Sequence, residues 1–345
     1  MRRNRRGKRK IIIALIIAAA LLALFIAGLQ FAEKLGLKDV QFGDTGEWGD
    51  GKIETTEFGL NDKLYVTKDN LDTYLIIGTD SGGVDEGEMY SGELADFVTL
   101  LLVDNTTKKF AFLQMDRNSM VEMAVPDETG SAEDLQKMQL CISHWYGRDA
   151  DERNEYTANA VTTLLGDLEI DNVYSLEMTD IGQVNHAIGG VEVDIETDMT
   201  NVDPAFVKGA HVLLDDDQAE KFVRARMNVG KGTNAERMAR QTQYMQKAYN
   251  LVMNQLRENP NYINDLYSEL DGKIHTTGSG KDFSRLTNQL LEYEALGIMH
   301  FTGTTKMGDT LGEGLKKEDY HEEFYVDDES ILACYKKIMN IKEQQ

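Results

Sequence analysis

The chain has 345 residues, with 36 Lys and Arg against 59 Asp and Glu, a formal net charge of −23, 41% hydrophobic residues and two cysteines. This composition excludes a collagen, a disulfide scaffold and a wholly disordered chain, and the length allows one large domain or two ordinary ones. The charge argues against a nucleic-acid binder, since neutralising phosphates needs a basic surface. Residues 1–10 nevertheless carry seven Lys and Arg and no acid, so the remaining chain is near −30 once these seven charges are taken from −23.

The amino terminus predicts a membrane anchor. Residues 11–29 are an unbroken run of apolar or small residues directly behind the basic residues 1–10. A helix of that length spans about 28 Å, close to the thickness of the bilayer core. The basic flank predicts a single-pass protein of the cell membrane, with a cytoplasmic amino terminus beside anionic lipid headgroups and an extracellular main domain. A cleaved signal peptide is the alternative, but its apolar core would be shorter and residues 28–32 make a poor cleavage site.

Residues 30–70 are polar and glycine-rich and predict an extracellular spacer, after which strands and helices alternate. Short apolar runs predict strands at residues 74–77, 97–103, 110–115, 173–178, 191–195 and 323–326. Three- and four-residue spacing predicts helices at residues 158–168, 181–187, 216–224, 235–257, 283–296 and 329–341. Residues 303–314 are glycine-rich and read as a loop. We therefore expect one α/β domain over residues 71–345, with three layers around a central mixed sheet.

The cysteines and histidines indicate no metal centre. Cys141 and Cys334 are far apart in the sequence; oxidising surroundings would permit a disulfide, and free or buried thiols are the alternative. The six histidines are scattered without a helical pair, which gives little support to zinc catalysis.

Polar residues stand at the ends of three predicted strands. Asp80 leaves the first strand into a glycine-rich segment, Asp96 precedes the second, and Arg117 follows the third. If these strands are neighbours, two carboxylates and a guanidinium converge at one rim. Two oxygen ligands and a phosphate suit Mg²⁺, which keeps several waters in proteins. The alternative is that both aspartates only form turns or cap helices.

A second polar group surrounds a glycine turn at residues 230–232. It consists of Arg224, Arg226, Arg237, Arg240 and Gln241. On a helix, Arg237, Arg240 and Gln241 share one face, along the edge of an apolar stripe. Arg224 and Arg226 can point the same way only if their helix ends there into extended chain. The grouping favours a bidentate anion site, whereas surface ion pairs are the alternative for each arginine alone.

The order and spacing of these motifs resemble the LytR-CpsA-Psr family of envelope proteins. The resemblance covers the chain from about Leu71 to its end, and the amino-terminal anchor agrees with it. The short motifs that carry it are Gly78-x-Asp80, Asp96, Arg117, Lys137, Ile188–Val191, Val223–Arg226 and Arg237-x-x-Arg240-Gln241.

The resemblance implies an extracellular phosphotransferase that uses Mg²⁺ (or Mn²⁺). Such a protein moves a glycopolymer, for example wall teichoic acid or capsular polysaccharide, from a polyprenyl pyrophosphate lipid to peptidoglycan through a phosphodiester. The resemblance also implies an apolar lipid pocket between sheet and helices. It makes Asp80 and Asp96 the metal ligands. It makes Arg117, Arg224 and Arg226 catalytic, and it gives the pyrophosphate contacts as Arg117, Arg224, Arg226, Arg237, Arg240 and Gln241.

Two positions depart from the family pattern. Asn118 stands after Arg117 where the family has an acid, and Asn234 replaces an Asp three residues before Arg237. Both changes remove a carboxylate that could orient an arginine or act as a base, and Asp116 is a candidate for the displaced acid. The alternative functions are a polyprenyl-phosphate-binding regulatory protein with little turnover and, if the arginines face solvent, an adhesin.

Overall fold

The computed structural model describes residues 55–80, 92–127, 129–132, 134–227, 229–259, 262, 266, 270, 273–277, 285–286, 289–308 and 321–344. The predicted anchor at residues 11–29 lies outside this set, as does most of the predicted spacer. Within the set, no helix is both long and apolar enough to cross a membrane.

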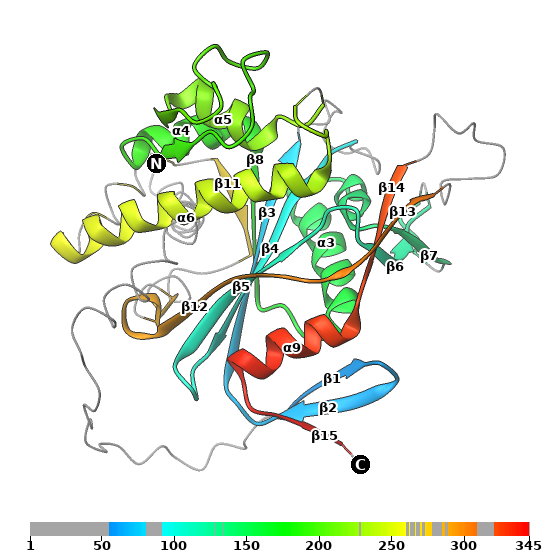
Figure 1. The fold of residues 1–345 in the computed structure, drawn as a ribbon. Coiled ribbons are helices and arrows are strands. Elements are labelled where there is room, and N and C mark those ends of the chain that lie inside the picture. Colours follow the sequence, from blue (N-terminus) through cyan, green and yellow to red (C-terminus); the bar gives the residue numbers. More distant parts are fainter. Residues whose placement is uncertain are drawn as a thin grey trace, which may run out of the picture.

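A six-stranded mixed sheet forms the centre of the molecule, in the order β11–β8–β3–β4–β5–β12 (Figure 1). The pairs β8–β3 and β12–β5 are parallel and the other three pairs are antiparallel. Four of the apolar runs expected as strands form its middle, and the other two form strands outside it, which confirms the α/β class and the mixed sheet. The strands are β3 (Leu71–Asp80), β4 (Leu94–Asp104), β5 (Lys109–Met115), β8 (Asn172–Glu177), β11 (Ile274–Thr276) and β12 (Glu294–His300).

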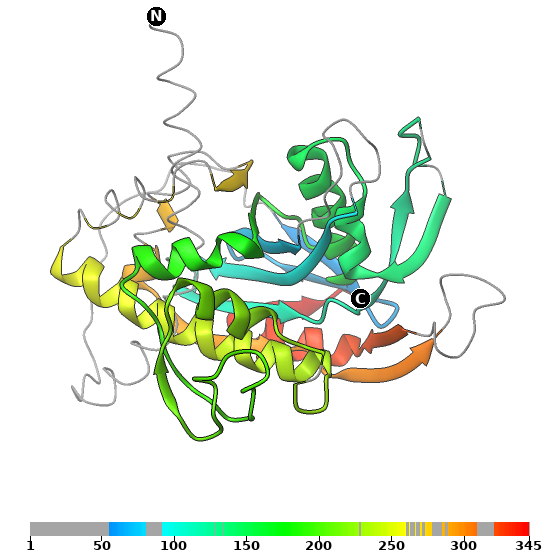
Figure 2. The ribbon, with the colours of Figure 1, turned by 90° about the horizontal axis from the view of Figure 1, so that it is seen from above.

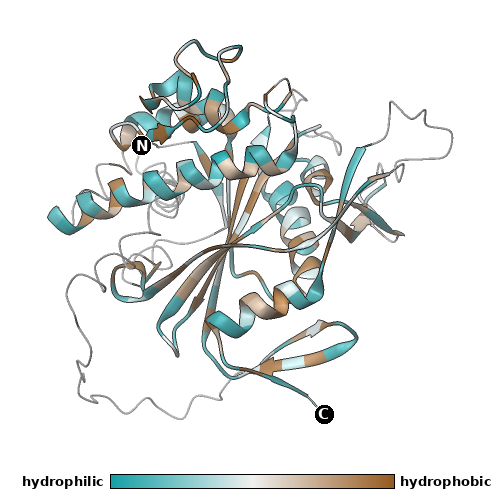
Figure 3. Ribbon diagram, viewed as in Figure 1, coloured by the Kyte–Doolittle hydropathy of each residue, from teal (hydrophilic) through white to brown (hydrophobic). Residues whose placement is uncertain are grey.

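The sheet is buried on both faces, because alternate residues of its strands point to opposite sides. On β3, Tyr74 and Ile76 join one apolar core and Leu75 and Ile77 join the other. Helices α4–α6 cover the first face and α3 lies on the opposite side (Figure 2). Hydrophobic residues follow the central strands, while much of α6 is hydrophilic (Figure 3). The helices are α3 (Ala150–Leu164), α4 (Ile181–Ala187), α5 (Asp216–Arg224), α6 (Asn234–Glu258) and α9 (Asp328–Ile338), with 3₁₀ turns at η1 (Leu140–Trp145) and η2 (Met178–Asp180).

Short strands form hairpins around this centre, with β1, β2 and β15 in a small sheet and the others in pairs β6–β7, β9–β10 and β13–β14. Their bounds are β1 (Thr56–Leu60), β2 (Lys63–Thr67), β6 (Met120–Val125), β7 (Asp134–Gln139), β9 (Glu192–Asp194), β10 (His211–Leu213), β13 (Gly303–Gly308), β14 (His321–Val326) and β15 (Ile341–Glu343).

Two of these hairpins correct the sequence predictions. Residues 56–67, placed in the spacer, form β1 and β2, and the carboxy-terminal β15 pairs with β2. The ordered domain therefore begins before residue 71. Residues 303–308 are a strand rather than a loop, since each of them pairs with β14.

Three predicted helices also have different bounds, and the one expected at residues 329–341 ends at Ile338, before Ile341 begins β15. Residues 294–296, expected to end a helix, begin β12, because pairing with β5 outweighs their local preference. The helix expected at residues 158–168 starts at Ala150, where the Asp149 side chain accepts a hydrogen bond from the Glu152 N–H. It ends at Leu164, because Gly166 and Asp167 have positive φ angles. Cys141 and Cys334 are both buried and free, so no disulfide joins them.

A buried histidine on η1 predicts a pH dependence of folding. His144 Nδ1 lies 3.0 Å from Thr157 Oγ1, and burial lowers the pKa of His144 to about 3, with the charge of Arg153 acting in the same direction. Below the unfolded pKa of about 6.5, this histidine binds a proton in the unfolded chain but not in the folded chain. The free energy of unfolding therefore falls by about 1.4 kcal/mol for each unit by which the pH is lowered. Urea unfolding measures the free energy of unfolding at several pH values between about 6 and 4. Its decrease per pH unit should be smaller by this amount in His144→Gln than in the unmodified chain. An unchanged slope would contradict the assignment.

Candidate functional site

Asp96 occupies an irregular position in the central sheet. The pairing of β3 with β4 shifts between Gly78 and Thr79, so that Phe97 pairs with Gly78, Ala95 pairs with Thr79 and Asp96 is the extra residue. A bulge of this kind re-aims a side chain, and bulges are frequent beside active sites. The bulge and the end of β3 bring Asp96 and Asp80 to the same rim, as the sequence predicts.

Two arginines from different elements flank the Asp96 carboxylate. Arg117 Nε, just past β5, lies 3.0 Å from Asp96 Oδ1, and Arg237 Nη1, on the first turn of α6, donates to Oδ2 at 2.8 Å. The Asp96 and Arg237 side chains are only 14% and 5% exposed. Burial lowers the pKa of Arg237, and the positive charges of Arg117 and Arg226 lower it further. The negative charge of Asp96 raises the pKa of Arg237 and so partly offsets burial. Arg117 and Arg237 thus share the Asp96 carboxylate, and Arg226, the third member of this arginine group, lies near enough to Arg237 for its charge to act on it.

Asp80 forms a second, more exposed ion pair. Arg224 Nη2 donates to Asp80 Oδ1, and Arg224 Nη1 donates to Glu220 Oε1 at 2.6 Å, one turn earlier on α5. The Arg224 and Asp80 side chains are 32% and 42% exposed, so this pair lies at the open side of the rim.

Arg226 lies in extended chain after α5, as expected. The helix ends at Arg224, and Ala225 leaves it with φ −54° and ψ 128°. Arg226 Nε donates to the Gly232 carbonyl at 3.3 Å, and Gly232 has a φ of +69°, which favours glycine at this turn. Among the residues described above, no carboxylate forms an ion pair with Arg226. Its guanidinium therefore retains the capacity to bind an anion.

Arg240 and Gln241 hold α5 in place. Arg240 donates to the carbonyls of Phe222, at 3.0 Å, and Ala225, and Gln241 Nε2 donates to the Val223 carbonyl at 3.3 Å. These carbonyls belong to the last turn of α5, which has no intrahelical partners for them. Burial lowers the pKa of Arg240 to about 10. In this structure both side chains support the segment that carries Arg224 and Arg226.

The two asparagines that depart from the family pattern are buried and hydrogen-bonded. Asn118 Nδ2 donates to Glu322 Oε1 at 3.0 Å, and Asn234 Nδ2 donates to Asp116 Oδ1 at 2.7 Å. Burial raises the pKa of Asp116. Asp116 therefore does reach the arginine group, as its place beside Arg117 suggested.

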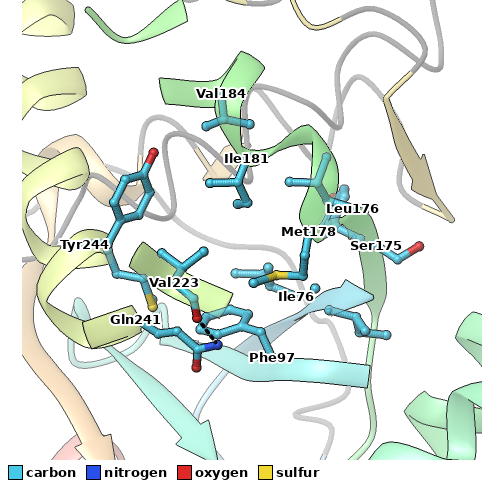
Figure 4. Close-up of a pocket in the computed structure, with 14 residues that line it drawn as sticks. Ile76, Phe97, Ser175, Leu176, Met178, Ile181, Val184, Val223, Gln241 and Tyr244 are labelled. Carbon is cyan, nitrogen blue, oxygen red and sulfur yellow. Dashed lines mark hydrogen bonds between the residues drawn. The ribbon is translucent and has the colours of Figure 1, made fainter. Parts of the chain in front are cut away.

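A narrow apolar cavity of about 50 Å³ adjoins the charged rim, which consists of Asp80, Asp96, Arg117, Arg224, Arg226 and Arg237. Figure 4 shows the residues that line the cavity. Gly78, Phe97 and Val223 line it, and these residues are chain neighbours of Asp80, Asp96 and Arg224. A Cβ on Gly78 would lie 2.6 Å from Met178 Sδ and 3.0 Å from Phe97 Cβ, so a larger residue here would force the Met178 side chain to move. The family resemblance implies an apolar pocket between sheet and helices, but the motifs that carry it do not identify the residues that line this cavity. The other lining residues are Ile76, Ile77, Tyr174, Ser175, Leu176, Met178, Ile181, Val184, Gln241, Tyr244 and Met245.

The arrangement offers oxygen donors beside cationic donors. Asp80 and Asp96 lie on neighbouring strands, and each is paired with arginine. No cluster of three or more His, Cys, Asp or Glu side chains suited to a metal ion occurs in the described ranges. Lys137, a further motif residue, lies on β7 with its ammonium 5.5 Å from the centre of the Tyr325 ring.

Several solved structures share this fold. The gbs0355 protein of Streptococcus agalactiae is 17% identical with a TM-score of 0.60, over 78% of this chain and 86% of that chain. TagV of B. subtilis is 18% identical with a TM-score of 0.57, over 78% of this chain and 96% of that chain. A structure of TagT bound to LI-WTA is 17% identical with a TM-score of 0.53, over 78% and 89%.

Sequence comparison identifies the family directly. No curated protein is similar enough to this chain to count as a match. The LytR_cpsA_psr family matches residues 50–322, which is well over half of the chain and includes every residue of the charged rim. The chain belongs to the LytR_cpsA_psr family.

Proposed function

We propose that this protein is a membrane-anchored phosphotransferase that moves a glycopolymer from a polyprenyl pyrophosphate lipid to peptidoglycan. The observation that carries the proposal is that the charged rim adjoins the apolar cavity. Gly78, Phe97 and Val223 line the cavity and lie within two residues of Asp80, Asp96 and Arg224 of the rim. A charged headgroup on an apolar chain needs both surfaces side by side. Family membership and the likeness to TagT bound to LI-WTA support a glycopolymer, such as wall teichoic acid or capsular polysaccharide, as the transferred group.

The arginines would bind and stabilise the pyrophosphate. Arg117, Arg224, Arg226 and Arg237 present guanidinium groups from three segments, and such groups bind phosphate oxygens bidentately. A peptidoglycan hydroxyl would attack the phosphorus next to the sugar, lose its proton and form a phosphodiester as the phosphoanhydride breaks. Polyprenyl phosphate leaves, and the arginines offset the charge that develops on it. Arg240 and Gln241 would act through α5.

Asp80 and Asp96 would hold Mg²⁺ or Mn²⁺. Both are carboxylates, the ligand type that these ions prefer, and they are partly exposed at one rim, which fits a metal that also takes phosphate oxygens and water. When bound, the metal would neutralise part of the pyrophosphate charge. Residues 11–29 would anchor the protein in the cell membrane with the domain outside and residues 1–10 against anionic lipid.

Reconstituted transfer tests this proposal. The purified full chain is incubated with a polyprenyl-pyrophosphate-linked glycopolymer, peptidoglycan and Mg²⁺, with EDTA in a parallel sample. We expect polymer linked to peptidoglycan by a phosphodiester, with release of polyprenyl phosphate, in the sample with metal only. Tight binding of the lipid without product would instead support a polyprenyl-phosphate-binding regulatory protein, a function favoured by the amides at positions 118 and 234.

Filling the cavity should prevent lipid binding. Ile181 lines the cavity from α4, and Ile181→Trp would occupy this space with apolar bulk at a stability cost of about 1–3 kcal/mol. We expect affinity for polyprenyl phosphate, measured on the full chain, to fall at least about tenfold because the lipid chain is excluded. Leu213→Trp on β10, where Leu213 is 63% exposed, is the matched control. Equal affinity in both variants would place the lipid elsewhere.

A further inference from the structure

A chain of hydrogen bonds leads from Asp116 to the arginine group. The Asp116 carboxylate accepts from the Asn118 backbone N–H at 2.8 Å and from Asn234 Nδ2 at 2.7 Å. Asn234 Oδ1 accepts from Arg237 Nη2 at 2.6 Å and from Arg237 Nε at 3.2 Å. Since Arg237 Nη1 donates to Asp96, the guanidinium is held from two sides.

The amide of Asn234 is the link that makes this chain possible. Its NH₂ group donates to Asp116 while its oxygen accepts from Arg237, and an amide offers both functions at any pH near neutrality, which an ionised carboxylate does not. An ionised Asp at position 234 would place two carboxylates at hydrogen-bond distance and could not donate. Asn234 is 1% exposed and Arg237 4%, so water does not replace a lost bond readily.

We infer that Asp116 is a positioning residue, which orients Arg237 through the Asn234 amide for contact with the pyrophosphate. This role rests on the proposed phosphotransfer. It gives a structural context to the amide at position 234, one of the two departures from the family pattern, because this amide joins the Asp116 carboxylate to Arg237. Arg237 donates two hydrogen bonds to the Asn234 side-chain oxygen.

Exchanging the two side chains tests the role of Asp116. Asn234→Asp alone should lower kcat for transfer at least about tenfold, because the carboxylates at 116 and 234 oppose each other. Asp116→Asn alone should cost less, since two amides still form a hydrogen bond. The double variant Asp116→Asn/Asn234→Asp should recover most of the lost kcat, because its amide at position 116 can donate to the carboxylate at position 234, which still accepts from Arg237. Asn159→Asp, at an exposed position on α3, is the control for added charge.

The measurements separate this role from the proposed function. The kcat and KM for the lipid-linked donor, donor affinity and urea unfolding are measured for the full chain and all four variants. If the unmodified chain transfers the polymer but the double variant is as slow as Asn234→Asp, the role of Asp116 is overturned and the proposed function stands. If the unmodified chain shows no transfer and also does not bind the donor, the proposed function and this role are both overturned. Recovery of stability without recovery of kcat would show that the hydrogen bonds only support the fold.

Discussion

Arg226→Ala is expected to lower kcat for glycopolymer transfer by about 10²–10³, with little change in stability. Removing one preorganised donor to developing charge has an effect of this size. Among the described residues, the Arg226 side chain makes one hydrogen bond, to the Gly232 carbonyl, and its removal leaves none of their carboxylates unpaired. The free energy of unfolding should therefore change by less than about 0.5 kcal/mol. Steady-state transfer kinetics and urea unfolding of the same preparations check both parts.

Two further variants sharpen this test. Arg226→Lys keeps the charge but loses the planar fork, so its kcat should lie between those of the unmodified chain and Arg226→Ala. Arg257→Ala, in the last turn of α6 where Arg257 contacts Asn254 at 3.5 Å, should transfer at the normal rate. Full activity of Arg226→Ala would remove Arg226 from the site and weaken the case for pyrophosphate chemistry.

The four middle strands of the central sheet, β8, β3, β4 and β5, and helices α4–α6 could be predicted because their signals are local. Apolar runs marked the strands, and α4 and α5 begin and end where their periodicity does. The misplaced segments depend in part on distant partners. β2 also pairs with β15 at the other end of the described chain, and β13 exists through its pairing with β14. The β1–β2 hairpin itself is local, with Asn61 and Asp62 at positive φ in its turn, and this turn signal was missed.

The site shows the same division. Strand ends and helical spacing bring Asp80, Asp96 and the arginines to one rim. Sequence spacing could not show that Asp96 sits at a bulge between two arginines, or that Arg240 donates to carbonyls of α5. These details follow from register and side-chain packing. The motifs therefore predict which side chains lie close together, whereas the hydrogen bonds and ion pairs of each side chain can be known only from the folded structure.

Asp96→Ala is expected to destabilise the protein by about 3 kcal/mol. Asp96 is the carboxylate partner of both Arg117 and Arg237, and its removal leaves buried guanidinium groups without that compensation. Removing one partner of a buried ion pair lowers the free energy of unfolding by about 3–5 kcal/mol. We expect a value near the lower end of this range because the Asp96 side chain is 14% exposed. Urea unfolding of the full chain measures the change.

Asp80→Ala is the matched control, since Asp80 is the other proposed metal ligand. Its ion pair with Arg224 is 42% and 32% exposed, and such pairs contribute less than about 1 kcal/mol. If both aspartates bind metal, both variants lose transfer activity, but only Asp96→Ala also loses stability. Equal stability of the two variants would show that water or local rearrangement compensates Arg117 and Arg237. Transfer by either variant at the normal rate would exclude that aspartate as a required metal ligand, whatever its part in the fold.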